Sequence, residues 1–483
     1  MLEWLLANED ADVNTQSGVW GTAIQAAAMK GSKDIVELLL KHDANVNIQG
    51  GYAGTALAAA AVCGSKDIVE LLLKYGANVK IQEGFWGSAL QAAAFTGQSD
   101  IVELLLNCDA DVNAQGGSFG TALQGAAASG YKNTVEILLK NNADVNVQAG
   151  MTGTALQAAA SGGYKDVVEL LLLHSAEVTS ATQEGTALHA AAAKGHKDVV
   201  ELLLLHGADI DSQGDKFSTA LHNAAAEGHK DVVELLLLHG ADISQADDFG
   251  MVLQYATAEG HKDIVELLLL HGAEVNTPAG DSGTALQVAA GFGHKNIFEL
   301  LILHGADVNV QSGRPYGSAI QAAAELGQKD MVELLLKHNA DINIQGGHYG
   351  TAIQGAAVEG HMDIVKILLN HNADVNAQAG YYGTAIQGAA AEGHKTIVEL
   401  LLSHGANVNT SAGYFGTAIQ AAAAKGFSSI VDLLLDHKAE INLQEGFHST
   451  PIQGAAVKGN RDIVKSIVLW TSHPNSNCRG SYH

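Results

Sequence analysis

Residues 21–53 hold the pattern that decides the fold: Gly21-Thr-Ala-Ile-Gln-Ala-Ala-Ala-Met-Lys-Gly31, Ser32-Lys-Asp-Ile-Val-Glu-Leu-Leu-Leu-Lys-His42 and Asp43-Ala-Asn-Val-Asn-Ile-Gln-Gly-Gly-Tyr-Ala53. Thr22 with Gln25 three residues later is a capping box, which predicts that a helix begins there. Gly31 is suited to end this helix as a left-handed residue. The alanines between give the helix a slim face that lets neighbouring helices approach closely.

A second helix is predicted over Lys33–His42, with an apolar stripe formed by Ile35, Val36, Leu39 and Leu40. The residue after it is Gly, Asn or Asp in most copies, the types that tolerate positive φ, so this column is interpreted as a helix stop. Ser175 and Lys438 depart from that preference. The paired glycines near residue 50 indicate a turn or hairpin, called here a finger.

The signature Gly-Thr-Ala-(Leu/Ile)-Gln-x-Ala-Ala recurs, with some degeneracy, along the whole chain. The fourteen copies, called here repeats 1–14, start at Gly21, Gly54, Gly87, Gly120, Gly153, Gly185, Ser218, Gly250, Gly283, Gly317, Gly350, Gly383, Gly416 and Ser449. Ten of the thirteen intervals are 33 residues, while 153→185 and 218→250 are 32 and 283→317 is 34. A helix pair this short cannot bury its own apolar face, so neighbouring repeats must stack.

The expected architecture is therefore all-α with short β-hairpin fingers, in one curved superhelical solenoid. With helices roughly 8–10 Å apart, fourteen repeats would extend well over 100 Å. We expect a truncated N-terminal half-repeat over residues 1–20, with a helix over Leu2–Asn8, then a continuous array over 21–470. A polar tail over 471–483 is expected to be disordered.

Composition excludes several kinds of function. Lys and Arg number 26 against 52 Asp and Glu, a formal charge of −26, which argues against binding to nucleic acid. The apolar runs are too short to span a bilayer, so no membrane insertion is expected. Cys63, Cys108 and Cys478 show no metal or redox spacing. We expect an intracellular, monomeric array, most readily in the cytoplasm, with a nuclear location left open.

The 33-residue unit resembles the ankyrin repeat: helix, turn, helix, Gly-Ala-Asp-Val-Asn and a finger. Gly228-His-Lys-Asp-Val-Val-Glu-Leu-Leu-Leu-Leu-His-Gly-Ala-Asp242 shows it well. The family's Thr-Pro-Leu-His appears here mostly as Thr-Ala-Leu-Gln, with His only at His189 and His222 and Pro only at Pro451. The Gln-Gly-Gly-x-(Tyr/Phe)-Gly variant is similar to arrays of fungal multidomain proteins that carry nucleotide-binding, STAND/NACHT-like signalling domains.

The resemblance also implies that one asparagine column could be β-hydroxylated. The alternative is that each side chain simply bonds the backbone of the hairpin. The column consists of Asn14, Asn47, Asn113, Asn146, Asn276, Asn309, Asn343, Asn376, Asn409 and Asn442.

No catalytic, cofactor-binding or metal-binding site is expected. Gly388–Thr396 is one residue off the phosphate-loop pattern and falls in an ordinary turn between helices, while Gly116–Gly120 has the letters of a nucleophile elbow without the sheet. Two histidine columns are interpreted as residues that shape turns and bond carbonyls at helix ends, with metal binding or a pH response as the alternative. They are His196, His229, His261, His294, His361 and His394, and His206, His239, His271, His304 and His404.

Aromatic residues are the informative deviation. Of 25 Phe, Tyr and Trp, fourteen fall in the two positions just before a repeat start, and these are the candidate partner-binding residues. They are Trp20, Tyr52, Phe85, Trp86, Phe119, Phe217, Phe249, Tyr316, Tyr349, Tyr381, Tyr382, Tyr414, Phe415 and Phe447. The rings could brace the array by packing on one another or on first helices, or they could anchor a partner on the concave face.

The leading hypothesis is a non-enzymatic scaffold that binds partner proteins through the finger tips and first helices, most readily along Tyr316–Phe447. Replacing Tyr349, Tyr382 and Phe415 with alanine should then remove binding and keep the helical content. A second hypothesis is a regulatory or ligand-sensing arm of a larger signalling protein. The third, an enzyme or accessory factor for a small molecule, requires a deep polar pocket at the irregular intervals, whose residues the sequence does not reveal.

Overall fold

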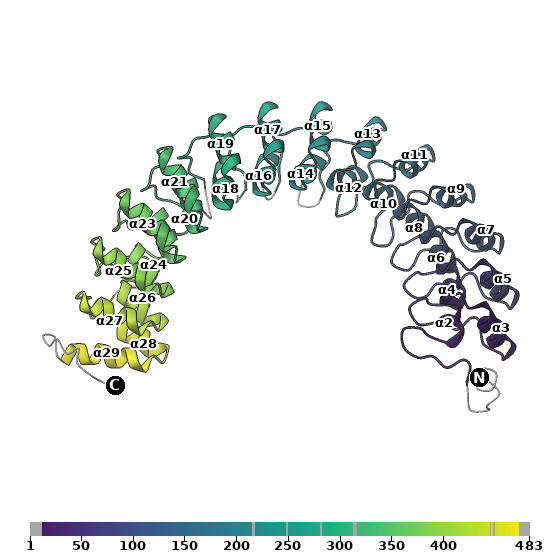
Figure 1. Cartoon of the computed structure of the whole chain (residues 1–483), viewed down its shortest axis with the longest axis horizontal. Coiled ribbons are helices and arrows are strands. Elements are labelled where there is room, and N and C mark those ends of the chain that lie inside the picture. The colour runs from purple at the N-terminus through teal and green to yellow at the C-terminus, as the bar shows by residue number, and fades with distance from the viewer. Residues whose placement is uncertain are drawn as a thin grey trace. The chain divides into compact units, whose positions relative to one another are not determined.

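The computed structural model describes residues 12–214, 218–247, 250–280, 283–312, 316–444, 446–447 and 450–472. The helix expected over Leu2–Asn8 lies outside these ranges, as does the tail from residue 473 onward. The chain forms two compact units that divide between Asp242 and Ile243. The N-terminal unit holds repeats 1–7 and the C-terminal unit holds repeats 8–14, each repeat contributing a first and a second helix (Figure 1).

In the N-terminal unit the first helices are α2 (Ala23–Met29), α4 (Ala56–Val62), α6 (Ala89–Phe95), α8 (Ala122–Ala128), α10 (Ala155–Ser161), α12 (Ala187–Ala193) and α14 (Ala220–Ala226). The second helices are α3 (Lys33–Lys41), α5 (Lys66–Lys74), α7 (Ser99–Asn107), α9 (Lys132–Lys140), α11 (Lys165–Leu173), α13 (Lys197–Leu205) and α15 (Lys230–Leu238).

In the C-terminal unit the first helices are α16 (Val252–Ala258), α18 (Ala285–Phe292), α20 (Ala319–Glu325), α22 (Ala352–Val358), α24 (Ala385–Glu392), α26 (Ala418–Lys425) and α28 (Pro451–Val457). The second helices are α17 (Lys262–Leu270), α19 (Lys295–Leu303), α21 (Lys329–Lys337), α23 (Met362–Asn370), α25 (Lys395–Ser403), α27 (Ser428–Asp436) and α29 (Arg461–Ser472). Helix α29 thus takes in residues 471–472, which were expected to begin the tail.

Each unit is a two-layer stack in which every first helix contacts the first helix of the next repeat. The fingers leave the first-helix layer on the side away from the second helices (Figure 1). Alanines make the close approach possible, because Ala59, Ala60 and Ala61 are fully buried between neighbouring helices. The stacking of repeats on one another confirms the solenoid expected from the period.

The predicted helix starts are confirmed, and the second helix, predicted over Lys33–His42, ends one residue earlier, at Lys41. The Thr22 main-chain N–H donates to Gln25 Oε1 at 2.6 Å, and Thr22 Oγ1 accepts from the Gln25 N–H, which completes the capping box. Gly31 has φ +66° at the end of α2. The helix stop is left-handed even where the residue type does not favour it, with φ +66° at Ser175 and +63° at Lys438.

The second helices bury one side only. Val36, Leu39 and Leu40 are buried as expected, but Ile35 is 40% exposed, although its equivalents Ile68 and Ile101 are fully buried. Helix α3 belongs to repeat 1, and the described residues contain no second helix before it that could cover Ile35.

The fingers contain little regular strand. Antiparallel bridges close most of them, for example Gly50↔Gly54 and Gly116↔Gly120. The finger before repeat 8 forms the two short strands β1 (Ala246–Asp247) and β2 (Gly250–Met251), with Ala246 opposite Met251 and Asp247 opposite Gly250.

Candidate functional site

A buried glutamine on each typical first helix holds the next finger in place. Gln25 accepts from the Thr22 N–H, and its Nε2 donates to the carbonyls of Ile48, Gly50 and Gly54 at 2.9–3.2 Å. The glutamine side chain thus bonds its own helix cap and the finger that follows. Each finger is fixed to a helix rather than free in solvent, which preorganises whatever its tip carries.

Histidine takes this role where it replaces glutamine. His189 Nδ1 accepts from the Thr186 N–H at 3.2 Å, and Nε2 lies 3.2 Å from the Ser218 carbonyl, to which it donates. Burial lowers the pKa of His189, which favours this neutral tautomer.

Main-chain hydrogen bonds join successive finger tips. We call these main-chain hydrogen bonds the finger ladder. The residue two places before a repeat start is called the outer position, and the residue one place before it is called the inner position. In the N-terminal unit the outer-position N–H of Tyr52, Phe85, Ser118 and Met151 each donates to the outer-position carbonyl of the preceding finger, at 2.7–3.2 Å. In the C-terminal unit Tyr381, Tyr414 and Phe447 do the same at 2.9–3.0 Å.

The outer-position rings stack along the finger ladder and remain accessible. Tyr381 and Tyr414 have ring centroids 5.1 Å apart, Tyr414 and Phe447 5.0 Å, and Tyr52 and Phe85 5.0 Å. Their exposed fractions run from 36% at Phe85 to 67% at Phe447. These rings form an aromatic surface on a fixed backbone.

The inner-position rings pack against the end of their own first helix. Phe415 is 6% exposed and packs among Ala391 and Ala421, with Lys425 Nζ 5.7 Å from its ring centroid. Trp20 is more open, at 52% exposed, with Lys30 Nζ 5.2 Å from its centroid.

In the middle of the C-terminal unit the inner-position contact is a hydrogen bond. Tyr349 Oη donates to Glu359 at 2.7 Å, and Tyr382 Oη donates to Glu392 at 2.8 Å. Burial and these carboxylates raise the pKa of both phenols, so they stay protonated donors. Tyr316 is half-buried and lies near Glu325.

In the N-terminal unit the inner rings meet a ring on a first helix. Phe95, at the end of α6, lies 4.0 Å from Phe119 and 5.2 Å from Trp86, centroid to centroid. Apart from Trp20, the described inner rings pack inward, while the outer rings face solvent. Phe217 and Phe249 lie outside the described residues.

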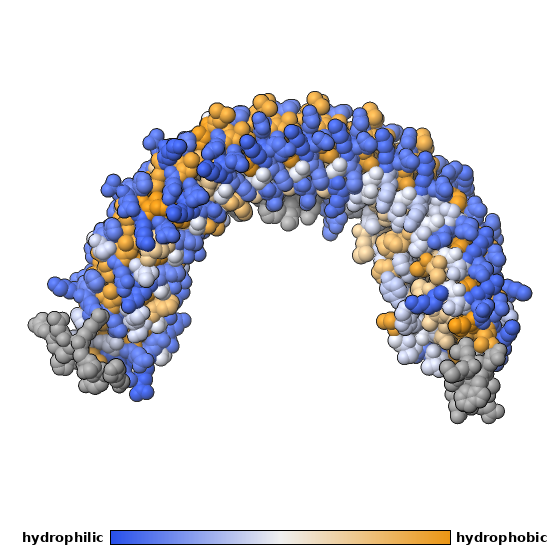
Figure 2. Space-filling model, viewed as in Figure 1, coloured by the Kyte–Doolittle hydropathy of each residue, from blue (hydrophilic) through white to orange (hydrophobic). Residues whose placement is uncertain are grey.

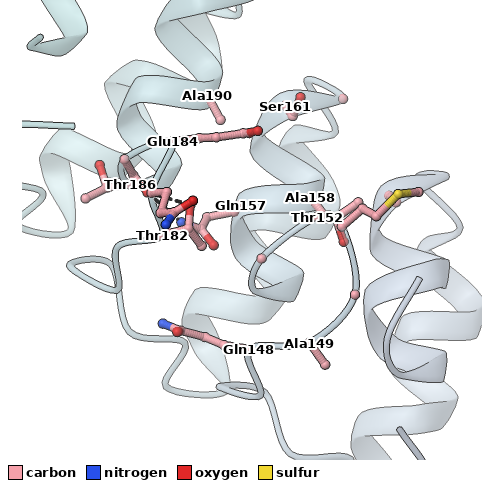
Figure 3. Close-up of a pocket in the computed structure, with 17 residues that line it drawn as sticks. Gln148, Ala149, Thr152, Gln157, Ala158, Ser161, Thr182, Glu184, Thr186 and Ala190 are labelled. Carbon is pink, nitrogen blue, oxygen red and sulfur yellow. Dashed lines mark hydrogen bonds between the residues drawn. The ribbon is translucent and has the colours of Figure 1, made fainter. Parts of the chain in front are cut away.

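A pocket of about 630 Å³ opens where the finger ladder stops, at the 32-residue interval 153→185 (Figure 3). Polar side chains line much of it, including Gln148, Thr152, Thr182 and Glu184. Glu184 is the one charged residue among those that line it, and its side chain extends across the pocket towards the part of α10 that carries Ser161 (Figure 3). Sequence reasoning missed these residues, although the short interval marked the place.

The histidine columns bond carbonyls as expected. In the first column, Nε2 lies 2.9–3.1 Å from a carbonyl at the end of the first helix of the previous repeat. This holds for His196, His229, His294, His361 and His394. His206, His239, His271, His304 and His404 place Nδ1 2.9–3.0 Å from a carbonyl of their own second helix. In the described part of the chain no three His, Cys, Asp or Glu side chains gather to hold a metal ion.

The asparagine column joins repeats in a way that the sequence did not predict. Asn47 Nδ2 donates to the Gly76 carbonyl at 3.0 Å, and its Oδ1 accepts from the Asn78 N–H at 2.8 Å. The partner is the turn after the next repeat's second helix, rather than the hairpin backbone that we expected. The amide group reaches this turn because the stacked repeats place it beside the next helix stop.

The two motif-like stretches occupy ordinary repeat positions. Gly388 is inside α24, and Gly393, with φ +86°, caps that helix before α25. Gly116 and Gly120 close a finger by an antiparallel bridge. Neither place provides the strand and helix on which a phosphate loop or a nucleophile elbow depends.

An apolar row on the second helices was also missed. Leu173, Leu205 and Leu238, the last residues of α11, α13 and α15, are 73–74% exposed, and we call them the exposed leucine row. Figure 2 shows hydrophobic colour along the side of the stack on which the second helices lie. Lysine fills the same position in α3, α5 and α9, so the change of residue type was the available signal. Among described helices none is long and apolar enough to cross a membrane.

A family model described as "Ankyrin repeats (3 copies)" matches residues 1–83, 81–149, 123–214, 204–279, 253–346, 320–412 and 389–478. The chain belongs to the ankyrin-repeat family. A search of curated proteins finds no match. Ankyrin repeats are generally protein-interaction modules, which supports a scaffold role.

Proposed function

We propose that this ankyrin array is a scaffold that binds partner proteins through its fingers and first helices, with the outer-position rings of the C-terminal unit as the main anchors. The observation that carries the proposal is the row Tyr381, Tyr414 and Phe447: three stacked, exposed rings on consecutive fingers joined by main-chain hydrogen bonds. Rigid aromatic side chains dominate binding energy at protein interfaces.

Preorganisation supports this choice of residues. Each ring in the row already stacks on its neighbour, and the three fingers are held by Gln354, Gln387 and Gln420 and by the finger ladder. A partner that docks here therefore loses little additional side-chain and loop entropy on binding. Inner-position rings contribute by holding the fingers, because they pack on the first helices.

Charge adds a preference for the partner. Glu392 pairs with Lys425 at 3.7 Å, but Glu359 has no ion pair within the described ranges, and Glu325 lies close enough to repel it. The carboxylates of Glu325 and Glu359 favour a partner segment with basic side chains, because a positive charge would relieve the repulsion between them.

The test is affinity capture with the whole chain, followed by measurement of the captured protein's Kd against a triple variant, Tyr381→Ala, Tyr414→Ala and Phe447→Ala. Anchor residues cost about 2 kcal/mol or more each, so binding should weaken by well over tenfold. Thermal unfolding should change little, because these rings are substantially exposed.

The matched control is the double variant Tyr52→Ala and Phe85→Ala, which removes a stacked outer pair from the N-terminal unit. It should leave the Kd unchanged. Equal affinity of the triple variant and the wild type would overturn the proposal.

A further inference from the structure

The finger that precedes repeat 6 is one residue short, and this changes its geometry. Thr182 and Gly185 bond each other directly, N–H to carbonyl in both directions at 2.9 and 3.1 Å, so only Gln183 and Glu184 form the turn. The ordinary bridge, such as Gly116↔Gly120, encloses three residues. The tip of the shorter finger makes no main-chain hydrogen bond to the preceding finger, and both fingers lie in the described part of the chain.

The finger ladder therefore ends at Met151. Its N–H donates to the Ser118 carbonyl at 3.2 Å, but its carbonyl accepts no hydrogen bond from Gln183, although both residues belong to the described chain. The main-chain N–H of Gln183 likewise donates to no described carbonyl of the preceding finger. One main-chain acceptor and one main-chain donor are thus left for an incoming segment.

The pocket occupies the space that inner-position rings fill elsewhere. Two repeats before it, Trp86 and Phe119 stack with centroids 6.0 Å apart, but the next two inner residues are Thr152 and Glu184. Thr152 Oγ1 is buried without a hydrogen-bond partner, which is a cost that a polar ligand group would remove. The volume of about 630 Å³ lies in the range of ligand sites.

We propose that this pocket binds a tyrosine side chain carried on an extended segment of a partner protein. The chain's own pairs show the chemistry, since Tyr349 and Tyr382 donate their hydroxyls to glutamates at 2.7 and 2.8 Å. Glu184 reaches across the pocket towards the part of α10 that carries Ser161 (Figure 3), where its carboxylate can accept from such a hydroxyl. This inference shares with the proposed function only the premise that the ligand is protein.

The same carboxylate sets the selectivity. A phenylalanine would fill the volume but has no hydroxyl to donate to Glu184, and the loss of one hydrogen bond to a charged group weakens affinity about tenfold. A phosphotyrosine would place its negative charges against Glu184 and should be rejected.

The experiment is an NMR titration of the 483-residue chain labelled at its methionine methyl groups. The probes are acetyl-Gly-Gly-Tyr-Gly-Gly-amide and its phenylalanine and phosphotyrosine counterparts. Met151 lines the pocket and is 74% exposed, so its methyl resonance reports binding, while the other five methionines serve as internal controls. The tyrosine peptide should shift Met151 saturably, the phenylalanine peptide should bind about tenfold more weakly, and the phosphotyrosine peptide should cause no shift.

Two variants secure the assignment. Thr152→Phe places a ring in the pocket, where it can continue the stack from Phe119, and should abolish the shift while the other methionine resonances stay in place. Glu184→Gln should remove most of the preference for tyrosine over phenylalanine, and the control Glu169→Gln, on the exposed side of α11, should keep it.

An unchanged Met151 resonance, equal shifts of all six methionines, equal affinity for tyrosine and phenylalanine, or unaltered binding by Thr152→Phe would overturn the inference. None of these outcomes touches the scaffold proposal, whose test replaces rings in the C-terminal unit.

Discussion

Removal of the Phe415 ring should open the array between repeats 12 and 13. The ring is 6% exposed, packs among Ala391 of α24 and Ala421 of α26, and lies 6.0 Å from Tyr382, centroid to centroid. Replacement of a buried phenylalanine by alanine costs about 3–5 kcal/mol. We therefore expect Phe415→Ala to lose roughly 3 kcal/mol locally, which lowers hydrogen-exchange protection about a hundredfold.

Hydrogen exchange read by mass spectrometry is the suitable assay, because a repeat array does not unfold as one cooperative unit. The loss of protection should centre on α24 and α26, and protection in the N-terminal unit should stay as in the wild type. The matched variant is Phe447→Ala, which removes a ring that is 67% exposed. Its stacking on Tyr414 is worth about 0.5–1.5 kcal/mol, so it should cost much less.

Equal losses in the two variants would refute the division into bracing inner rings and exposed outer rings. The result also bears on the sequence-based expectation that Tyr349, Tyr382 and Phe415 can be removed without structural effect. With Phe415 buried, that triple variant should unfold the fingers locally, so loss of binding in it would not identify a contact with the partner.

Lys438 holds a left-handed conformation at φ +63°, so Lys438→Gly should stabilise α27 by about 1 kcal/mol in hydrogen exchange, and Asn372→Gly by less, because asparagine tolerates this region. Burial, with repulsion from Glu359 added, raises the pKa of Glu325 to about 7. The protonated form of Glu325 therefore stabilises the folded state fully below pH 4.5, and this contribution is lost as the pH rises through 7. Glu325→Gln should match the wild-type Tm at pH 4.5 and exceed it at pH 8. A difference in Tm that is the same at both pH values would contradict this assignment. Replacing the exposed leucine row by lysines should change the Tm little, because these side chains are 73–74% exposed, and a Tm lowered by more than a few degrees would show that the row packs in the folded chain.

Much of the fold follows from the sequence because each repeat carries the same signals for where its helices begin and end. Thr22 and Gln25 predict a cap that forms as expected, and Gly31 predicts the positive φ that ends α2. The period of 33 then leaves stacking as the one way to bury the alanine faces. The columns reinforce one another, so an exception such as Ser175 still adopts the conformation that its neighbours impose.

The candidate site was only partly predictable. The enrichment of aromatic residues before each repeat start identified the fingers, but not which of two adjacent rings would be buried. Phe415 and Tyr414 differ in environment because successive finger residues point to opposite sides, one to the first helix and one to solvent. The number of residues in each turn decides this alternation, and residue type alone does not reveal it.

Variation in length has a different effect from variation in residue type. At the helix stop, Lys438 or Ser175 replaces a favoured residue, and the surrounding helices hold the backbone in the same left-handed turn. In a finger, one missing residue before Gly185 tightens the turn, ends the hydrogen bonds between tips and opens a pocket. The helices tolerate substitution because neighbouring helices contact them on both sides, whereas the tips of neighbouring fingers share one main-chain hydrogen bond. Binding specificity in this chain should therefore depend more on the length and tip residues of its fingers than on the helices that support them.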